Sequence, residues 1–514
     1  MKSLPIKLAW ALCASALALS GCAAMKAADE PVPLTGLADA RGAGKAEVRG
    51  TWITTTANAA LSTPESTAHT MRTLRAIGLN TVYVECWKNG YTNFPSETLK
   101  RVIGVDRRPA DAKADPSDGA GRPARDLLEE SVIEAHRNGL VAVAWFEYGF
   151  MAAHQSTLNH LRRQKPDWLS RDIRGGEVAP NGFVWMNPLH PEARRFLLEL
   201  VLEAIDRYDL DGIQLDDRIV WPYVTMGYDD HTKKVYAAEH GGREPPADHT
   251  DPAWMRWRAD KVNEFARLFT QEVRARRPGL IVSLSPAVYP WSWEHYLLEW
   301  PKWAAWTEKD RHPGASGATA RATPRWDEFI PQAYRLNYTS FETTWLSQVR
   351  AMRELGGDRQ QDLLAGIRIQ GDGPDSTWDD LRRSIELTRA QGNGGHVLWF
   401  SRGVLERYPR ELTAFYGGWV PSPRFAAHWR PMSLPLFRSA GRAVGAGEVA
   451  WERGDIPRGR YQLIGHDGRA WTVVRDVEIE RDTGAGGKTV FFLPAGYAQV
   501  ELLVDRRDQL ARGR

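Results

Sequence analysis

The fold is decided by residues 208–217, Tyr-Asp-Leu-Asp-Gly-Ile-Gln-Leu-Asp-Asp, an apolar strand that ends in two acids. An amphipathic segment, Glu192–Arg207, comes directly before this strand and follows Pro191, which is typical of the first turn of a helix. The apolar stripe of the segment consists of Phe196, Leu197, Leu200, Val201, Ala204 and Ile205. A helix that leads into a buried strand is the repeating unit of a parallel β/α fold.

The same alternation of strand and helix patterns continues on both sides of this unit. Runs rich in β-branched and aromatic residues predict eight strands: Val48–Thr55, Thr81–Trp87, Val141–Glu147, Gly212–Asp217, Ile281–Pro286, Phe329–Tyr334, Leu363–Ile369 and His396–Ser401. Thr63 and Pro64 are typical of a helix start and Gly78 of its end, and Asp126 caps a further helix that ends near Gly139. Helices of this kind are expected between the strands.

Eight strand and helix units predict an α/β fold in which residues 47–425 form a (β/α)8 TIM barrel. A doubly wound sheet is the alternative, but the first strand is followed by no glycine-rich dinucleotide turn. The barrel is therefore the preferred interpretation.

The chain changes character after Pro421, where the helical period disappears. Short strands separated by Gly, Asp and Pro turns are predicted at Gly447–Glu452, Tyr461–Gly465, Trp471–Glu480, Thr489–Leu493 and Ala498–Val504. Residues 426–514 are thus expected to form a small, sandwich-like all-β accessory domain. A role in binding polysaccharide and a role as a spacer are both open.

Residues 1–22 are typical of an export signal with a lipid-attachment box. The apolar stretch Leu8–Leu19 follows two lysines and is too short to span a bilayer. Small residues then lead directly into Cys22, which would become the lipid-bearing N-terminus of the mature protein. An ordinary secretory signal with an incidental cysteine is the alternative.

Lipidation at Cys22 predicts a protein anchored in the cell envelope. Residues 23–46 are rich in Ala, Gly, Pro and charge, and are expected to be a flexible tether. Because Ala23 rather than an aspartate follows the cysteine, we expect the anchor to reside in the outer membrane, with the protein facing the periplasm.

Charge and cysteine usage argue against several classes of protein. The formal net charge is +3 and there is no long basic run, so no nucleic-acid partner is expected. Cys86 is the one cysteine outside the signal region and has no partner for a disulfide. The first strand lacks a His-x-His pair, and Lys88 stands in a loop, so neither a metal hydrolase nor a Schiff-base aldolase is favoured. No metal or cofactor is predicted.

The two acids that end the fourth predicted strand are the strongest candidates for chemistry. Side chains alternate along a strand, so Gln214 and Asp216 share one face while Ile213 and Leu215 share the other. The polar face is expected to point into the barrel mouth, and Asp217 toward the loop. Two acids at a strand end can instead simply cap the following loop.

Acids, amides and aromatics also end the neighbouring strands, and these ends meet at one rim of a barrel. Glycoside cleavage uses two carboxyl groups, one that protonates the leaving oxygen and one that attacks the sugar, stabilises its charge or activates water. We assign Asp216 as nucleophile or charge stabiliser and Glu147 as general acid, with Glu85 and Asp217 as alternatives. Glu147 could instead be only an ion-pair partner of Arg218 or Arg368.

The substrate-binding candidates are polar and aromatic side chains expected at the same rim. The chain has 22 tryptophans, and flat aromatic faces suit the apolar faces of sugar rings, although most tryptophans only pack. The candidates are Trp52, Trp87, Tyr148, Gln214, Trp221, Gln332, Tyr334, Arg368 and Trp399.

Several motifs in order resemble the glycosyl hydrolase-like 10 family over Val48 to Arg424. They are Arg49-Gly50-Thr51-Trp52, Asn89-Gly90-Tyr91-Thr92 with Pro95-Ser96, Trp185-Met186-Asn187-Pro188, Asp211-Gly212-Ile213-Gln214-Leu215-Asp216-Asp217 and Pro331-Gln332-Ala333-Tyr334. The resemblance implies a (β/α)8 hydrolase of glycans, with functional aspartates at Asp216 and Asp217. Two positions depart from the family pattern: Glu147 replaces an asparagine-type strand ending, and Arg218 stands where aromatic residues or histidine are commoner.

Together these features predict an envelope lipoprotein that hydrolyses glycosidic bonds of a polysaccharide. The resemblance suggests the glycan strands of peptidoglycan as the substrate class for envelope members of the family. The alternative is a non-catalytic glycan-binding lipoprotein that uses an aromatic mouth for recognition.

Overall fold

The computed structural model describes residues 47–109 and 125–424, together with seven strands between residues 438 and 504. The predicted signal segment with Cys22 and the tether at 23–46 lie outside the described residues, so they stay predictions. Within the part of the chain described, no helix is both long and apolar enough to cross a membrane.

Eight parallel strands form one sheet in the order β10-β9-β8-β5-β2-β1-β12-β11. Their bounds are β1 (Val48–Ile53), β2 (Thr81–Glu85), β5 (Val141–Phe146), β8 (Gly212–Asp216), β9 (Ile281–Ser285), β10 (Glu328–Phe329), β11 (Leu364–Arg368) and β12 (Gly395–Trp399). Parallel bridges from Phe329 to Leu363 and from Gln332 to Gly366 connect the two ends of the sheet. The predicted barrel and all eight of its strands are confirmed.

The sixth strand is shorter than predicted, since β10 stops at Phe329 instead of continuing to Tyr334. Pro331 has no amide hydrogen to donate to a sheet ladder, which explains the interruption. The interruption lies on the side of β11, where pairing resumes as a bridge at Gln332, since the amides of Ile330 and Gln332 still donate to the oxygens of Leu284 and Pro286 at 2.8 and 2.9 Å.

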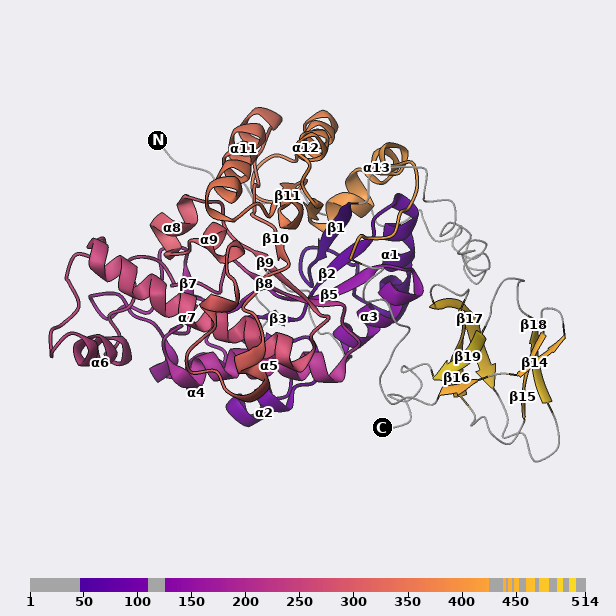
Figure 1. Ribbon diagram of the computed structural model, residues 1–514, viewed down its shortest axis with the longest axis horizontal. Helices are drawn as coiled ribbons and strands as arrows, with labels where there is room; N and C mark the ends of the chain where they lie inside the picture. The colour runs from indigo at the N-terminus through magenta and orange to yellow at the C-terminus, as the bar shows by residue number, and fades with distance from the viewer. Residues whose placement is uncertain are drawn as a thin grey trace, which may run out of the picture.

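Helices surround the strands (Figure 1). The longer ones are α1 (Pro64–Ile77), α3 (Leu127–Arg137), α5 (Pro191–Arg207), α6 (Asp230–Glu239), α7 (Pro252–Arg276), α11 (Tyr338–Leu355), α12 (Trp378–Ala390) and α13 (Pro409–Tyr416). The shorter ones are α2 (Glu97–Ile103), α4 (His160–Gln164), α8 (Trp291–Tyr296), α9 (Trp300–Ala304) and α10 (Gly317–Arg321). The predicted boundary signals are confirmed, because Thr63 and Asp126 accept capping hydrogen bonds and Gly78 ends α1 at φ 109°.

Two small hairpins, which the sequence patterns did not predict, follow β2 and β5. One joins β3 (Trp87–Lys88) to β4 (Tyr91–Thr92), and the other joins β6 (Met151–His154) to β7 (Phe183–Trp185). Both lie in connections that leave the carboxyl ends of barrel strands, so they belong to the face that carries the candidate site.

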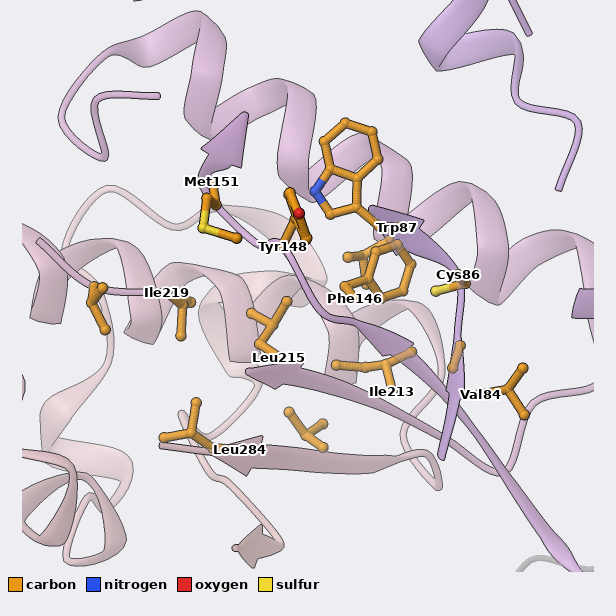
Figure 2. Packing of buried hydrophobic residues seen from close by; sticks show 14 of the residues in the cluster. Val84, Cys86, Trp87, Phe146, Tyr148, Met151, Ile213, Leu215, Ile219 and Leu284 are labelled. Carbon is orange, nitrogen blue, oxygen red and sulfur yellow. The ribbon is translucent and has the colours of Figure 1, made fainter. Parts of the chain in front are cut away.

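The barrel strands bury two separate apolar sets. Ile213 and Leu215 belong to the large cluster that also takes in helix residues, and Figure 2 shows them packed with Val84, Phe146 and Leu284. The interior cluster consists of Val48, Trp52, Tyr83, Val141, Val143, Trp145, Ile281, Ile330, Leu364 and Val397. The alternation predicted for the fourth strand is therefore observed, with its two apolar residues outside and its polar residues inside.

The seven strands after the barrel form two antiparallel sheets. One is ordered β13-β19-β16-β17 and the other β14-β15-β18. Their bounds are β13 (Arg438–Ala440), β14 (Arg442–Gly445), β15 (Glu448–Glu452), β16 (Gly459–His466), β17 (Trp471–Ile479), β18 (Lys488–Phe492) and β19 (Gln499–Val504). The five predicted strands correspond to β15–β19, β13 and β14 were not predicted, and the assignment of a sandwich-like domain stays a prediction.

Candidate active site

Asp216 is the last residue of β8 and its side chain is almost fully buried. Trp145 Nε1 donates to Oδ2 at 2.9 Å, and the amide of Asp217 donates to Oδ1 at 2.7 Å. Gln332 Nε2 also donates to Oδ1. These contacts hold the carboxyl group in one orientation, and each of them favours its ionised form.

Arg218 lies among three carboxyl groups. Its Nη1 is 3.2 Å from Asp216 Oδ2 and 3.2 Å from Asp217 Oδ1, and its Nη2 is 3.9 Å from Glu147 Oε1. Nη1 also donates to the backbone oxygen of Glu147 at 3.0 Å. Burial alone would lower the pKa of Arg218, but the carboxylates of Asp217 and Asp216 raise it above its ordinary value. One guanidinium therefore holds the ends of β5 and β8 together.

Glu147 follows β5 and is held less tightly than Asp216. Lys88 Nζ lies 3.5 Å from its Oε2, yet that oxygen has no hydrogen-bond partner although it is buried. A buried acceptor without a donor is costly, so this oxygen is suited to a hydrogen bond with a ligand.

Glu85, an alternative acid in the sequence interpretation, is fully buried at the end of β2. Its oxygens accept from the Thr55 amide at 3.0 Å and the Thr55 hydroxyl at 2.5 Å, and Lys88 Nζ lies 3.5 Å away. Because both oxygens are already bonded, we assign Glu85 to positioning β1 and Lys88 rather than to proton transfer.

Burial and the neighbouring charged groups shift the pKa of Asp216 in opposite directions. Burial raises the pKa of Asp216 well above its ordinary value, Arg218 lowers it, and the nearby carboxylates of Asp217 and Glu147 raise it further. The protonation of this group therefore depends on which charges stand beside it.

Aromatic rings in the barrel interior contact one another and, through Trp145, Asp216. Trp399 stacks on Tyr334 with ring centroids 5.6 Å apart, and both are only partly buried. Trp52 contacts both rings and is fully buried, while its Nε1 donates to Gln214 Oε1 at 2.7 Å. Tyr334 and Trp399 can contact a ligand, whereas Trp52 and Gln214 support them from below.

Several predicted substrate contacts must be corrected, since their side chains are buried against protein. Trp87 packs on Phe196 in the large cluster of Figure 2, and Trp221 donates to the Met226 carbonyl within its own loop. Tyr148 is also buried and donates to Asn89 Oδ1 at 3.0 Å. A fully enclosed ring offers no free face to a sugar.

Arg368 is likewise removed from the ligand contacts. Its guanidinium donates to the carbonyls of Pro374 and Asp372 at 2.8 and 2.9 Å, which fixes the loop between β11 and α12. Of the two arginines expected to pair with an acid, only Arg218 contacts Glu147 in the described part of the chain.

The structure adds Ser285, Gln370 and Ser401, which the sequence interpretation had not named, to the candidate acids Glu147 and Asp217. Buried oxygens without a hydrogen-bond partner follow several barrel strands: Glu147 Oε2, Asp217 Oδ1, Ser285 Oγ, Gln370 Oε1 and Ser401 Oγ. Ser285 stands opposite Asp216 in the ladder of β8 and β9, so strand alternation could have identified it. The carboxyl ends of the barrel strands meet at one rim, so these atoms can form hydrogen bonds with the many hydroxyl groups of a glycan bound there.

Within residues 47–109, 125–424 and the described strands, no cluster of three or more His, Cys, Asp or Glu could hold a metal ion. The observed site consists of carboxyl and amide side chains with aromatic side chains beside them. Its chemistry is that of paired carboxyl groups in a low-dielectric setting.

A family model and two curated relatives show which known proteins this chain is similar to. The model of the family "Glycosyl hydrolase-like 10" matches residues 47–310, slightly more than half of the chain. Glycosyl hydrolase YngK of Bacillus subtilis (strain 168) is 25% identical over 260 residues, which cover 47% of this chain and 45% of the relative. Glycosyl hydrolase DigH of Escherichia coli (strain K12) is 23% identical over 227 residues, which cover 42% and 45%.

Among solved structures, the glycoside hydrolase domain of PgaB (BpsB) from Bordetella bronchiseptica superposes with a TM-score of 0.46 at 14% identity, covering 68% of this chain and 92% of that one. The chain spans less than half the length of the two curated relatives.

Proposed function

Because the chain belongs to the glycosyl hydrolase-like 10 family, we propose that its barrel hydrolyses glycosidic bonds of a polysaccharide at the carboxyl ends of β5 and β8. One observation carries the proposal: Asp216 and Glu147, from neighbouring strands, share one guanidinium but differ in their hydrogen bonds. Asp216 accepts three N–H donors, whereas Glu147 Oε2 accepts none. Two carboxyl groups in unlike settings are what acid-assisted glycoside cleavage requires.

In this reaction Asp216 acts in its ionised form, which its N–H donors and Arg218 favour, while burial and the charge of Asp217 raise its pKa. It attacks the anomeric carbon or stabilises the positive charge that develops there. Glu147 in its protonated form gives its proton to the leaving oxygen as the C–O bond breaks. The ionised Glu147 then takes a proton from a water that attacks the anomeric carbon. Any bond between that carbon and Asp216 breaks as the new C–O bond forms, which restores both carboxyl groups.

The proposed substrate is the glycan strand of peptidoglycan, and the proposed location is the periplasmic side of a membrane. Support comes from the export signal and lipid box predicted in residues 1–22. A lipid on Cys22 would hold the barrel within reach of the cell wall.

The deciding experiment compares wild type with Asp216→Asn and Glu147→Gln. Peptidoglycan strands without stem peptides are the substrate, chitin and an α-glucan are the comparison polymers, and products are read by mass. Each variant should lose about 10²- to 10⁴-fold in rate, the size typical of removing an acid, base or nucleophile. Glu354→Gln, an exposed carboxyl group on α11, is the matched control and should keep full activity.

Equal activity of wild type and Asp216→Asn would reject the role given to Asp216. A wild-type protein that binds these strands and never cleaves them would instead establish the non-catalytic glycan-binding alternative.

A further inference from the structure

A second aromatic feature lies beyond the acids, in the connection that follows β9. Trp291 begins α8, and 37% of its surface is exposed. Among the large apolar side chains that the described residues leave exposed, the others are aliphatic: Leu158, Ile173, Val178 and Leu336. Trp291 is thus a partly exposed aromatic side chain in a connection that leaves the carboxyl end of a barrel strand, the face on which barrel active sites lie.

The ring of Trp291 is held rigidly. It stacks on His295 with centroids 4.3 Å apart and planes at 11°, and it meets the edge of Tyr296 at 5.0 Å. His295 Nδ1 also lies 3.1 Å from the Trp291 carbonyl oxygen. The imidazole covers one face of the indole, so the exposed part of the ring is what His295 and Tyr296 leave uncovered.

Further contacts connect this ring to the acid site. Tyr296 meets Tyr223 edge to face at 4.9 Å, and a hydrogen bond joins the two phenols. The loop after β8 is bound to α8 by the Val224 amide, which donates to the His295 carbonyl at 2.7 Å. Burial, followed by the charge of Asp217, raises the pKa of Tyr296, so Tyr296 lies within electrostatic reach of the acids.

We propose that Trp291, backed by His295, is a binding platform for a sugar ring of the polysaccharide that lies beyond the bond being cleaved. The inference rests on the proposed glycosidase function and names a subsite of it. The apolar C–H face of a pyranose is complementary to a flat indole face. Because the indole is already fixed by its neighbours, little side-chain freedom is lost when the sugar binds.

The test uses the full-length protein in an Asp216→Asn background, so that glycan is bound without being consumed. Peptidoglycan strands without stem peptides are titrated in a calorimeter. Adding Trp291→Ala should raise Kd about tenfold, which corresponds to the loss of about 1.4 kcal/mol. Trp291→Tyr keeps an aromatic face and should recover most of the affinity, and Leu158→Ala, an exposed apolar residue outside the platform, should leave Kd unchanged.

An unchanged Kd for Trp291→Ala, with thermal unfolding like that of its parent, overturns the platform. Absence of glycan binding by the parent overturns it as well. Cleavage is measured separately with wild type and Asp216→Asn, so failure of the glycosidase proposal is distinguishable from failure of this subsite.

Discussion

At the scale of single residues, the charge of Asp216 depends on two neighbours with opposite effects. Burial raises the pKa of Asp216, Asp217 raises it further, and Arg218 lowers it. If ionised Asp216 is required, activity falls as pH falls through this pKa. The acid limb of the pH profile should therefore lie above the ordinary range of a carboxyl group.

Replacing the two neighbours should shift that limb in opposite directions. Asp217→Asn removes a negative charge, so the pKa of Asp216 falls and the limb moves about one pH unit lower. Arg218→Gln removes the cation, so the limb moves about one unit higher. The measurement is kcat/KM against pH for both variants and wild type. Shifts of the same sign would show that the limb does not report Asp216.

At the scale of elements, the site depends on how closely β8 lies between its neighbours. A Cβ on Gly212 would come 2.8 Å from Ile281 Cβ and 3.0 Å from the Ile281 oxygen. Such contacts with an adjacent backbone cannot be relieved by turning a side chain, so the first residue of this strand has no room for a methyl group.

Gly212→Ala should lower the free energy of unfolding by about 1–3 kcal/mol, because β8 and β9 must separate to admit the methyl group. Urea denaturation is the measurement. Gly314→Ala is the matched control, since the atoms that a Cβ there would approach belong to the His312 side chain, which can move. Equal stability of the two variants would contradict the close packing of the strands.

At the scale of the whole molecule, the proposed location depends on one cysteine. Cys22 is preceded by small residues and by an apolar stretch, and the described barrel begins shortly after it, at Glu47. A lipid on Cys22 would confine the acid site to the neighbourhood of a membrane without any membrane-spanning helix.

Cells given an alkyne fatty acid should label the wild-type protein but not Cys22→Ser. Cys13→Ser is the control, because Cys13 lies inside the apolar stretch and cannot become the mature N-terminus. Labelling that persists in Cys22→Ser would place the lipid elsewhere or show that the box is not used.

The sequence by itself determined the barrel and the strand that carries the acids. Period-two alternation, helix caps and prolines are local signals, so they predicted all eight strands and the inward direction of Gln214 and Asp216. Pro331 is also a local signal and could have shortened the predicted sixth strand, whereas the strand pairs after β2 and β5 could not be predicted from local patterns.

Only the tertiary structure decided which rim residues are open to a ligand. Trp52 lies near the end of β1 and Trp87 just after β2, yet both are fully buried, while Trp399 at the end of β12 is not. The exposed fraction of each tryptophan depends on the residues that pack against its ring, and those residues come from distant parts of the chain. Arg218 likewise joins Asp216 to Glu147 only because parallel pairing places β5 beside β8. Burial and charge are properties of contacts between segments, which local sequence patterns do not contain.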